Sequence, residues 1–417
     1  MAMPHDTPNR RELLRNGAFF AAGGLFAARP HARAAESAAA GSPPMKITAF
    51  KPYLLRHQLR KPFGVSVSVP LDKTRSALLV KIETDAGLVG WGETAPINGT
   101  RGAIDDQLGP QLIGQNPLEH RRLWRELWGP NFGDALAVGA LDIALNDLRG
   151  KALNLPVAAL FGGRLRDRVP VYASAMNYIE DQKPENQYPQ EAASLVQQGF
   201  RALKMRLGRY PVAREVKVAA AVREAVGPDI KLMADGNAAS TLTTALRMGE
   251  ALNELGFAYF DDPLPQSPKY AGYEELRQKL PLALAAGEAV DSRSSAKQLI
   301  DRRAMDIIQP DVSLCGGIGE ALFIAELAAL SGIRCIPHCW GGASLIAATG
   351  QLLSLLPDPD WGFPTDTPML ELDQSENPWR TEIVDRPFVQ KEGHVAVPTG
   401  PGLGIEVDEA AVRRYAV

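Results

Sequence analysis

The residues of this sequence that could do chemistry recur at nearly regular intervals between Lys204 and Glu371. Most of them are carboxylates, and each stands at or near the end of a short apolar run. The intervals fall in the twenties to low thirties of residues, which is the length of one strand, one helix and the return to the next strand. Because the carboxyl ends of parallel strands in an α/β barrel open on one mouth, we expect these side chains to meet there.

Three carboxylates, Asp235, Asp261 and Glu288, close three consecutive apolar runs. At one mouth they would repel one another unless a cation lay between them. Mg²⁺ prefers oxygen ligands of this kind, so the three predict a metal site. Taken singly, each has a plainer interpretation, as a turn, a loop start or a partner of a helix dipole. Asp262 follows Asp261 directly, and periodicity alone does not decide which of the two faces the mouth.

A candidate base stands near the C-terminal end of the same region. His338 ends one apolar run, and Asp311 ends the run before it. A carboxylate on the neighbouring strand would hold one imidazole nitrogen and leave the other free to take a proton. The alternatives are a satisfied core histidine, or a soft-metal cluster of His338 with Cys335 and Cys339, which lacks a fourth nearby ligand.

A cationic pair is predicted on the second strand of the barrel. Lys204 and Arg206 lie two residues apart, so both side chains leave the same face of the strand. A desolvated lysine beside a metal can lose its proton near neutral pH, whereas arginine cannot serve as a base. Glu371, on the last strand, would reach the opposite side of the pocket as a proton donor or hydrogen-bond partner. The plainer interpretation of the pair is a solvated or salt-bridged strand end.

The elements that must position these residues follow a strand-helix pattern. Helical stretches at 191–198, 213–226 and 241–255 each end at a glycine, the expected C-cap. Strand candidates alternate with such helices, the first at 169–173 and the last, the eighth, at 368–372. The pattern predicts an α/β fold with a TIM-type barrel over residues 156–376, and a doubly wound sheet is the alternative.

Residues 45–155 have the pattern of a separate α+β domain. Two β-rich runs flank the turn at 85–87, which is a hairpin signal, and helical periodicity follows from 121 to 153. The loops at 63–68 and 94–102 interrupt it, and the first of them looks exposed. The last stretch, 377–417, holds no further strand-helix unit, so we expect it to pack back on this first domain.

The chain as a whole has 417 residues and a net charge of −3, which leaves no basic field for nucleic acid. No apolar run reaches the roughly 18 residues of a membrane span. Its three cysteines imply no disulfide framework. Residues 1–34 combine a twin-arginine pattern, a short apolar run and an Ala-x-Ala site, which predicts an export signal and a periplasmic protein. A disordered alanine-rich tail is the alternative to the export signal, and residues 35–44 would be a linker.

These residues and their neighbours resemble the ordered motifs of the enolase superfamily, in its mandelate racemase/muconate-lactonising branch. The matching motifs are Lys204-Met205-Arg206, Asp235-Gly236-Asn237, Phe260-Asp261-Asp262-Pro263, Gly287-Glu288, Gln309-Pro310-Asp311 and Pro337-His338. The resemblance implies a modified (β/α)7β barrel with an α+β capping domain that the C-terminal segment completes. It also implies one Mg²⁺ per subunit, a small carboxylate substrate and a homo-oligomer. Enolase-superfamily sites generally combine a lysine or histidine base with Mg²⁺.

The resemblance also assigns roles to single residues. Asp261 is the implied metal ligand, with Asp262 beside it in a supporting or substrate-facing role. Asn237 is implied to lie near the metal or the substrate. The capping-domain loops are implied to choose the substrate, and Phe63 and Asn98 are their candidate contacts.

Two positions depart from the family pattern. Arg206 stands where a second lysine is usual, and Asp261 stands where a glutamate is usual. The first change argues against a two-base racemase, because an arginine replaces the base that would act opposite His338. We therefore expect Mg²⁺-dependent removal of an α-proton to a metal-stabilised enediolate by His338, as in an acid-sugar dehydratase. The alternatives are a sugar-lactone cycloisomerase, a racemase or epimerase with Lys204 as the second base, and a periplasmic carboxylate-binding protein without catalysis.

Overall fold

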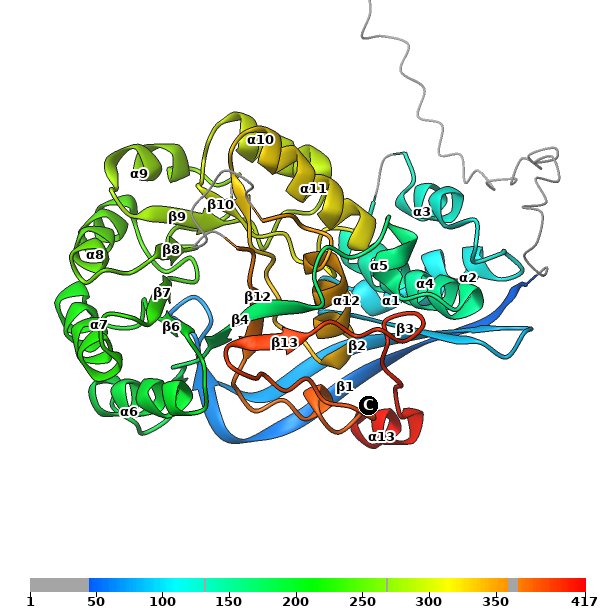
Figure 1. Cartoon of the computed structure of the whole chain (residues 1–417), viewed down its shortest axis with the longest axis horizontal. Helices are drawn as coiled ribbons and strands as arrows, with labels where there is room; N and C mark the ends of the chain where they lie inside the picture. The colour runs from blue at the N-terminus through cyan, green and yellow to red at the C-terminus, as the bar shows by residue number, and fades with distance from the viewer. Residues whose placement is uncertain (1–44, 131–132, 268, 359–366) are drawn as a thin grey trace, which may run out of the picture. The chain divides into compact units, whose positions relative to one another are not determined.

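The computed structural model describes residues 45–130, 133–267, 269–358 and 367–417 (Figure 1). The chain from Met45 to Val417 forms one compact unit. The predicted export signal and linker, residues 1–44, lie outside the described residues. Within the described ranges, no helix is both long enough and apolar enough to cross a bilayer.

The N-terminal part of the unit is an antiparallel sheet with helices on one side. The strands are β1 (Ile47–Gly64), β2 (Asp72–Thr84), β3 (Val89–Thr94) and the short β5 (Tyr178–Ile179), in the order β3-β2-β1-β5. The predicted hairpin turn joins β2 to β3, and Gly87 takes the left-handed conformation there, with φ 74°. The helical segments are α1 (Thr100–Gly102), η1 (Ala103–Leu108), α2 (Gly109–Leu112), α3 (His120–Trp128), α4 (Ala135–Leu153) and α5 (Val157–Leu160). We call residues 45–160 the capping domain.

Helix α4 packs directly on β3, and glycines allow the close approach. A Cβ atom at Gly90 would lie 2.2 Å from the carbonyl oxygen of Ala144, and one at Gly92 would lie 1.9 Å from that of Ala140. Any side chain at these two positions would push the strand away from the helix. The end of β3, which carries Glu93 and Thr94, is therefore fixed against a rigid support.

Among the described residues, the second sheet contains eight parallel strands, and each βα unit adds its strand beside the last. The order is β11-β10-β9-β8-β7-β6-β4-β12. The strands are β4 (Arg168–Ser174), β6 (Ala202–Arg206), β7 (Lys231–Asp235), β8 (Tyr259–Asp261), β9 (Ala283–Ala286), β10 (Ile307–Ile308), β11 (Arg334–Cys335) and β12 (Leu370–Asp373). The predicted α/β fold is confirmed, and the last strand returns to lie beside the first.

The inner face of this sheet shows that it curls into a barrel. One apolar cluster takes an inward side chain from, or directly beside, every parallel strand: Tyr172, Ala202, Met233, Tyr259, Ala285, Ile307, Ile336 and Met369. Side chains of all eight strands can meet only if the sheet closes on itself. Within the described residues, the hydrogen-bonded ladder itself ends at β11 and β12.

Helices cover the outside of the barrel (Figure 1). They are α6 (Pro184–Gln197), α7 (Val212–Val226), α8 (Leu242–Glu254), α9 (Tyr273–Lys279), α10 (Arg293–Asp301), α11 (Ile318–Leu330) and α12 (Ala343–Leu353). The glycines predicted to end the helices, Gly199, Gly227 and Gly256, all have positive φ. The C-cap prediction is confirmed by that conformation.

The C-terminal segment contacts both parts of the unit. It contains η3 (Pro378–Arg380), β13 (His394–Ala396) and α13 (Glu409–Tyr415). Strand β13 pairs antiparallel with β4 of the barrel. Glu409 accepts hydrogen bonds from Tyr53 and Lys81 of the capping domain, at 2.5 and 2.7 Å. The expectation that this segment packs on the capping domain was therefore incomplete, because it also extends the barrel sheet.

Candidate active site

The candidate active site is the layer of side chains directly above the apolar cluster in the barrel. Side chains alternate along a strand, so the residue two positions further on also points inward. The positions so related to the apolar cluster hold Ser174, Lys204, Asp235, Asp261, Gly287, Gln309, His338 and Glu371. The alternation along the strands thus brings five of the predicted residues, Lys204, Asp235, Asp261, His338 and Glu371, into one polar layer.

Lys204 lies at the base of this layer and is fully buried. Its Nζ atom is 2.7 Å from Asp261 Oδ2, 3.0 Å from Glu371 Oε1 and 3.3 Å from Asp235 Oδ2. Burial disfavours the ammonium, but the carboxylates outweigh it and hold the pKa of Lys204 well above its usual value. Lys204 is therefore a fixed cation in this structure.

Glu371 is the counterpart of Lys204 and is also fully buried. Burial alone would raise the pKa of Glu371, but the charges of Lys204, His338 and Arg206 hold it below its usual range. Because this carboxyl stays ionised, it accepts hydrogen bonds and does not donate a proton. Of the two predicted roles for Glu371, the geometry favours the hydrogen-bond partner.

Arg206 extends from β6 toward the mouth of the barrel. Its guanidinium forms an ion pair with Asp235 and donates a hydrogen bond to Ser174 Oγ at 2.9 Å. Its Cζ atom lies 4.7 Å from the ring centroid of Trp340, a cation–π distance. Asn237 Oδ1 accepts a further bond at 3.3 Å. Burial opposes the charge of Arg206, but Asp235 and the other nearby carboxylates outweigh it and raise the pKa of Arg206 above that of free arginine. Arg206 therefore supplies a fixed positive charge.

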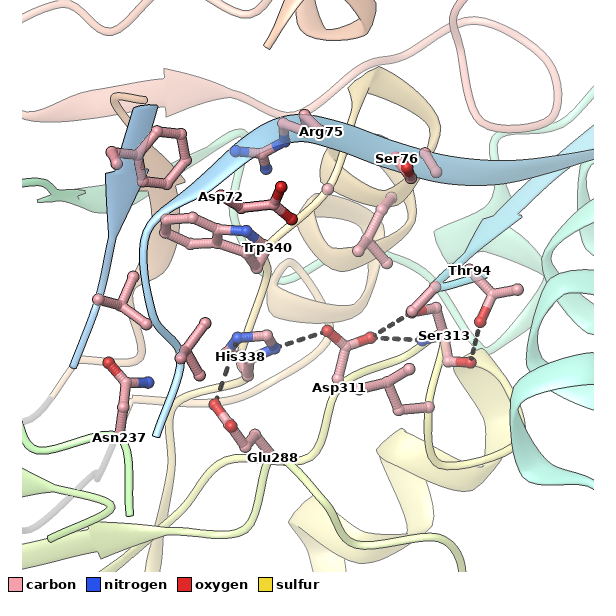
Figure 2. Close-up of a pocket in the computed structure, with 18 of the residues that line it drawn as sticks. Asp72, Arg75, Ser76, Thr94, Asn237, Glu288, Asp311, Ser313, His338 and Trp340 are labelled. Atoms are coloured by element: carbon pink, nitrogen blue, oxygen red, sulfur yellow. Dashed lines mark hydrogen bonds and ion pairs between the residues drawn. The ribbon is translucent and has the colours of Figure 1, made fainter. Parts of the chain in front are cut away.

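The predicted His338–Asp311 pair is formed (Figure 2). His338 Nδ1 lies 2.7 Å from Asp311 Oδ2, and the Nε2 atom faces Glu288 Oε2 at 3.4 Å. Asp311 Oδ1 accepts hydrogen bonds from the backbone N–H and hydroxyl of Ser313, both at 2.7 Å. Burial opposes the imidazolium, but Glu288 and the bond to Asp311 raise the pKa of His338 to about 10. The imidazole of His338 can therefore hold a proton. Because Asp311 engages Nδ1, Nε2 is the nitrogen that remains open to the cavity.

Glu288 reaches the mouth because the chain turns sharply after β9. Gly287 has φ 119°, and a Cβ atom there would lie 3.2 Å from the backbone nitrogen of Gln309. Only glycine adopts this conformation readily and fits this space. The turn places Glu288 beside His338 at the cavity, whereas Asp235 and Asp261 lie deeper.

The structure separates Asp262 from Asp261. Asp261 lies two residues after Tyr259, which points into the barrel, so the two side chains share that face. Asp262 turns outward with φ 34° and accepts hydrogen bonds from Gln266 and Tyr273. Aspartate tolerates the left-handed conformation better than most residues. Asp262 is therefore a structural residue outside the layer, and it does not line the cavity.

A cavity of about 350 Å³ lies between the capping domain and the barrel mouth (Figure 2). The barrel lines it with Arg206, Asn237, Glu288, Asp311, His338 and Trp340, and the capping domain closes it with β1, β2, β3 and the loop after β1. Phe63, a predicted substrate contact, is among the lining residues. Asn98 is exposed and is not among the lining residues, which from its loop are Thr94 and Ala95. Lys204 and Glu371 lie beneath the floor.

The lining residues that were not predicted from the sequence include two charged ones, Arg75 and Glu93. Arg75 is buried and forms an ion pair with Asp373 at 2.9 Å, and its Cζ lies 4.9 Å from the centroid of Trp340. Glu93 lines the wall next to Thr94. No periodic signal marks Arg75, but Glu93 stands in a Gly-Trp-Gly-Glu sequence, whose glycines mark a close approach between elements.

The donor set can be tested for a divalent cation. Among the described residues, no three His, Cys, Asp or Glu side chains are arranged to hold a metal ion, and Glu288 faces His338. Asp235 and Asp261 nevertheless converge on one cation, Lys204. Asp261 Oδ1 is buried and accepts no hydrogen bond from any described residue, and burial raises the pKa of Asp261 to about 6 despite Lys204. The unused oxygen and the hard donor chemistry fit Mg²⁺.

The soft-metal alternative has no support in the geometry. Cys335 and Cys339 are buried, as is Cys315. Burial raises the pKa of each thiol. They behave as small core residues in the described part of the chain.

Two family models match the chain. Residues 53–162 match the N-terminal domain of mandelate racemase and muconate lactonizing enzyme, and residues 187–411 match the enolase C-terminal domain-like model. The fold and the polar layer define an enzyme of the enolase superfamily. The chain belongs to the mandelate racemase/muconate lactonizing enzyme family.

Similar proteins include enzymes of three named activities. D-galactarolactone cycloisomerase of Agrobacterium fabrum is 36% identical over 89% of this chain and 99% of its own length. N-succinyl-L-Arg/Lys racemase of Bacillus cereus is 31% identical over 89% of this chain and 98% of its own. Arabinonate dehydratase of Saccharolobus solfataricus is 29% identical over 80% of this chain and 89% of its own.

Among solved structures, the 3,6-anhydro-D-galactonate cycloisomerase of Zobellia galactanivorans is similar to this chain with a TM-score of 0.79 and 32% identity. The match covers 89% of this chain and 99% of that one. The TIM-type barrel with a capping domain is thereby confirmed.

Proposed function

We propose that the protein removes the α-proton of an acid-sugar derivative and expels the oxygen at its β-carbon, with His338 as the group that moves the proton. The observation that carries this proposal is the asymmetry of the cavity. His338 Nε2 faces it, while Arg206 on the other strand end cannot accept a proton and Lys204 is buried beneath the floor in three ion pairs. One base favours elimination over racemisation, which needs a base on each face of the α-carbon.

The chemistry balances without a redox partner. The α-carbon loses its proton to the neutral form of His338, the electron pair forms the double bond between the α- and β-carbons, and the β-carbon–oxygen bond breaks. Neutralising the charge of Glu288, the strongest of those that raise the pKa of His338, would favour that neutral form. The imidazolium of His338 can return its proton to the leaving oxygen, and the resulting enol becomes a 2-keto acid. Asp311 holds the imidazole through Nδ1 in each step.

Asp235, Asp261 and Glu288 are the residues that would hold Mg²⁺. The ion would supply positive charge beside the substrate carboxylate and thereby make the α-proton more acidic. Arg206 adds a guanidinium at the cavity and Lys204 balances the buried carboxylates from below. Asn237 and Phe63, both at the cavity, would contact the substrate.

A ring oxygen is the leaving group that we favour, which would make the protein a sugar-lactone or anhydro-sugar cycloisomerase. The similarity to a cycloisomerase over 99% of that relative's length supports this choice. A hydroxyl leaving group, and hence acid-sugar dehydration, is the second candidate, and the similarity to arabinonate dehydratase favours it.

The test is incubation with Mg²⁺ and a library of sugar lactones, anhydro-sugar acids, aldonates and aldarates, followed by mass spectrometry and detection of 2-keto acids. Ring opening leaves the mass of the substrate unchanged, whereas dehydration removes one water. Racemised products without keto acid would refute the elimination. Thermal shifts by these acids without any turnover would favour the non-catalytic binding protein.

We also propose export to the periplasm, on the twin-arginine pattern of residues 1–34 alone. Cell fractionation of a strain that produces the full chain would test it, with a variant in which Arg10 and Arg11 are both lysine as the control. The predicted homo-oligomer stays a prediction as well, and sedimentation velocity would measure it.

A further inference from the structure

The end of strand β3 contacts both barrel segments that carry the His338–Asp311 pair. Glu93 accepts hydrogen bonds from the backbone N–H of Gly342 at 2.5 Å and of Leu345 at 3.2 Å. The next residue, Thr94, donates from its hydroxyl to the carbonyl oxygen of Ser313 at 3.1 Å (Figure 2). Glu93 and Thr94 are both buried, with 2% and 3% of their surface exposed.

The contact of Glu93 fixes the segment that leads from His338 into helix α12. Gly342 is the N-cap of that helix, and the first N–H groups of a helix have no partner within it. The carboxylate satisfies two of them and its charge suits the helix N-terminus. A Cβ atom at Gly342 would lie 3.0 and 3.1 Å from the carboxylate oxygens of Glu93, so the chain approaches the carboxylate as closely as backbone allows.

The contact of Thr94 fixes the other member of the pair. Ser313 donates two hydrogen bonds to Asp311 Oδ1, and the position of Ser313 therefore sets the direction of the Asp311 carboxylate. The carbonyl of Ser313 is held in turn by Thr94. Two adjacent residues of the capping domain, Glu93 and Thr94, thus hold the segments that carry both members of the pair.

We propose that Glu93 and Thr94 are positioning residues, through which the docked capping domain sets the geometry of His338 and Asp311. Both residues line the cavity, but their polar atoms are hydrogen-bonded to the barrel backbone, and through these bonds they act on the pair. The inference rests on the proposed function, because it assigns the proton transfer to this pair. It goes beyond that function in making the base depend on a strand of the other domain.

A matched control lies on helix α4. Asp142 also places a capping-domain carboxylate at the start of a barrel helix, since its Oδ2 accepts from Ile318 N at 2.8 Å. This contact lies beyond the turn that follows Ser313 and touches neither member of the pair. Loss of docking strength alone would therefore affect Asp142→Asn as much as Glu93→Gln.

The experiment compares kcat, KM and thermal unfolding of the wild type, Glu93→Gln, Thr94→Val and Asp142→Asn on the substrate found by the library screen. We expect kcat to fall roughly 10- to 100-fold for Glu93→Gln, because small displacements of a catalytic group cost about this much. Thr94→Val should fall less, Thr94→Ser should recover most of that loss, and KM should stay within about threefold. An unchanged kcat in both variants, or an equal loss in Asp142→Asn, would overturn the proposal.

A crystal structure of Glu93→Gln separates this inference from the proposed function. The wild-type distance between His338 Nδ1 and Asp311 Oδ2 is 2.7 Å. A longer distance with a displaced 338–342 segment supports the positioning role even if no substrate is turned over. An unmoved segment with the distance retained overturns it, whatever the enzyme does.

Discussion

Lys204 Nζ lies 2.7 Å from Asp261 Oδ2 beneath the floor of the cavity, with neither group open to solvent. The pair supports the part of the proposed mechanism in which the second strand of the barrel does not supply a base. Lys204 already forms ion pairs with three carboxylates. The residue two positions further on is Arg206, and an arginine cannot serve as a base. In the proposed mechanism, the proton transfer therefore falls to His338 on the far side of the cavity.

Replacing Lys204 with methionine should strongly destabilise the protein. The substitution removes the Lys204 cation from three buried carboxylates, of which Asp235 keeps its ion pair with Arg206, and breaking a buried ion pair costs about 3–5 kcal/mol. Denaturant unfolding of the free protein without added metal measures the loss. The control is Lys297→Met, which removes an exposed partner of Asp301 and should cost under about 1 kcal/mol. Equal stability of the two variants would show that Lys204 is not charged in the fold.

Replacing His338 with asparagine should abolish exchange of the substrate α-proton with solvent deuterium. The amide is close to the imidazole in shape but cannot take a proton at neutral pH. NMR of the recovered substrate in deuterated water measures the exchange. Lys391→Met, a change on the C-terminal segment far along the chain from the site, serves as the control. Exchange that survives in His338→Asn would identify another base and remove the basis of the proposed mechanism.

The polar layer could be predicted from the sequence because strand periodicity carries it. Each apolar run gives the strand, and alternation along the strand gives the inward residue. The choice between Asp261 and Asp262 depended on the resemblance, because alternation alone does not say which of two adjacent residues points into the barrel. The structure answers this, since Tyr259 belongs to the apolar cluster in the barrel and Phe260 to the outer core, so that Asp261 shares the inward face of Tyr259.

The capping-domain part of the site could not be predicted in the same way. Arg75 and Glu93 reach the cavity through the docking of one sheet on a barrel far along the chain, and no local pattern encodes that contact. Asn98 was predicted because the resemblance implies that its loop contacts the substrate, but the resemblance does not fix the direction of a loop side chain, and this one is exposed. The orientation of Glu288 toward His338 is likewise a tertiary result.

Added Mg²⁺ should raise the unfolding temperature of the protein after treatment with a chelator. A ligand that binds only the folded state stabilises it by about 2.7 kcal/mol at a concentration 100 times its Kd. The double variant Asp235→Asn and Asp261→Asn lacks two carboxylates of the donor set and should not respond. Differential scanning fluorimetry measures both. An equal shift in the two proteins would place the metal elsewhere.

The wild type should exchange the α-proton of only one epimer of a substrate pair. Arg206 occupies the strand end opposite His338, and a guanidinium stays protonated at any working pH. Each epimer is incubated separately in deuterated water, and label is followed by NMR. Arg206→Lys is the informative comparison, because the lysine keeps the charge but loses the fork that binds Asp235 and Ser174. Label in both epimers with the wild type would restore the two-base racemase.

Glu93 should make the stability of the protein depend on pH between about 4.5 and 7. Burial raises the pKa of Glu93 from 4.5 to about 7, although the N–H groups of Gly342 and Leu345 and the charge of Arg75 lower it, while Asp311 raises it further. In that window the folded state binds more protons than the unfolded state. The free energy of unfolding therefore falls as pH rises, so the stabilising contribution is complete below the lower limit and lost above the upper one.

The variant Glu93→Gln isolates this contribution, because glutamine has no proton to bind. The difference in unfolding free energy between wild type and variant should decline through the window by an amount on the order of 3 kcal/mol and be flat outside it. Urea unfolding at a series of pH values measures both curves, and taking the difference cancels the other titrating groups. Asp142→Asn, treated in the same way, controls for general weakening of the domain contact. If the wild-type and Glu93→Gln curves stay parallel, Glu93 is ionised throughout and its bonds to the start of α12 do not vary with pH.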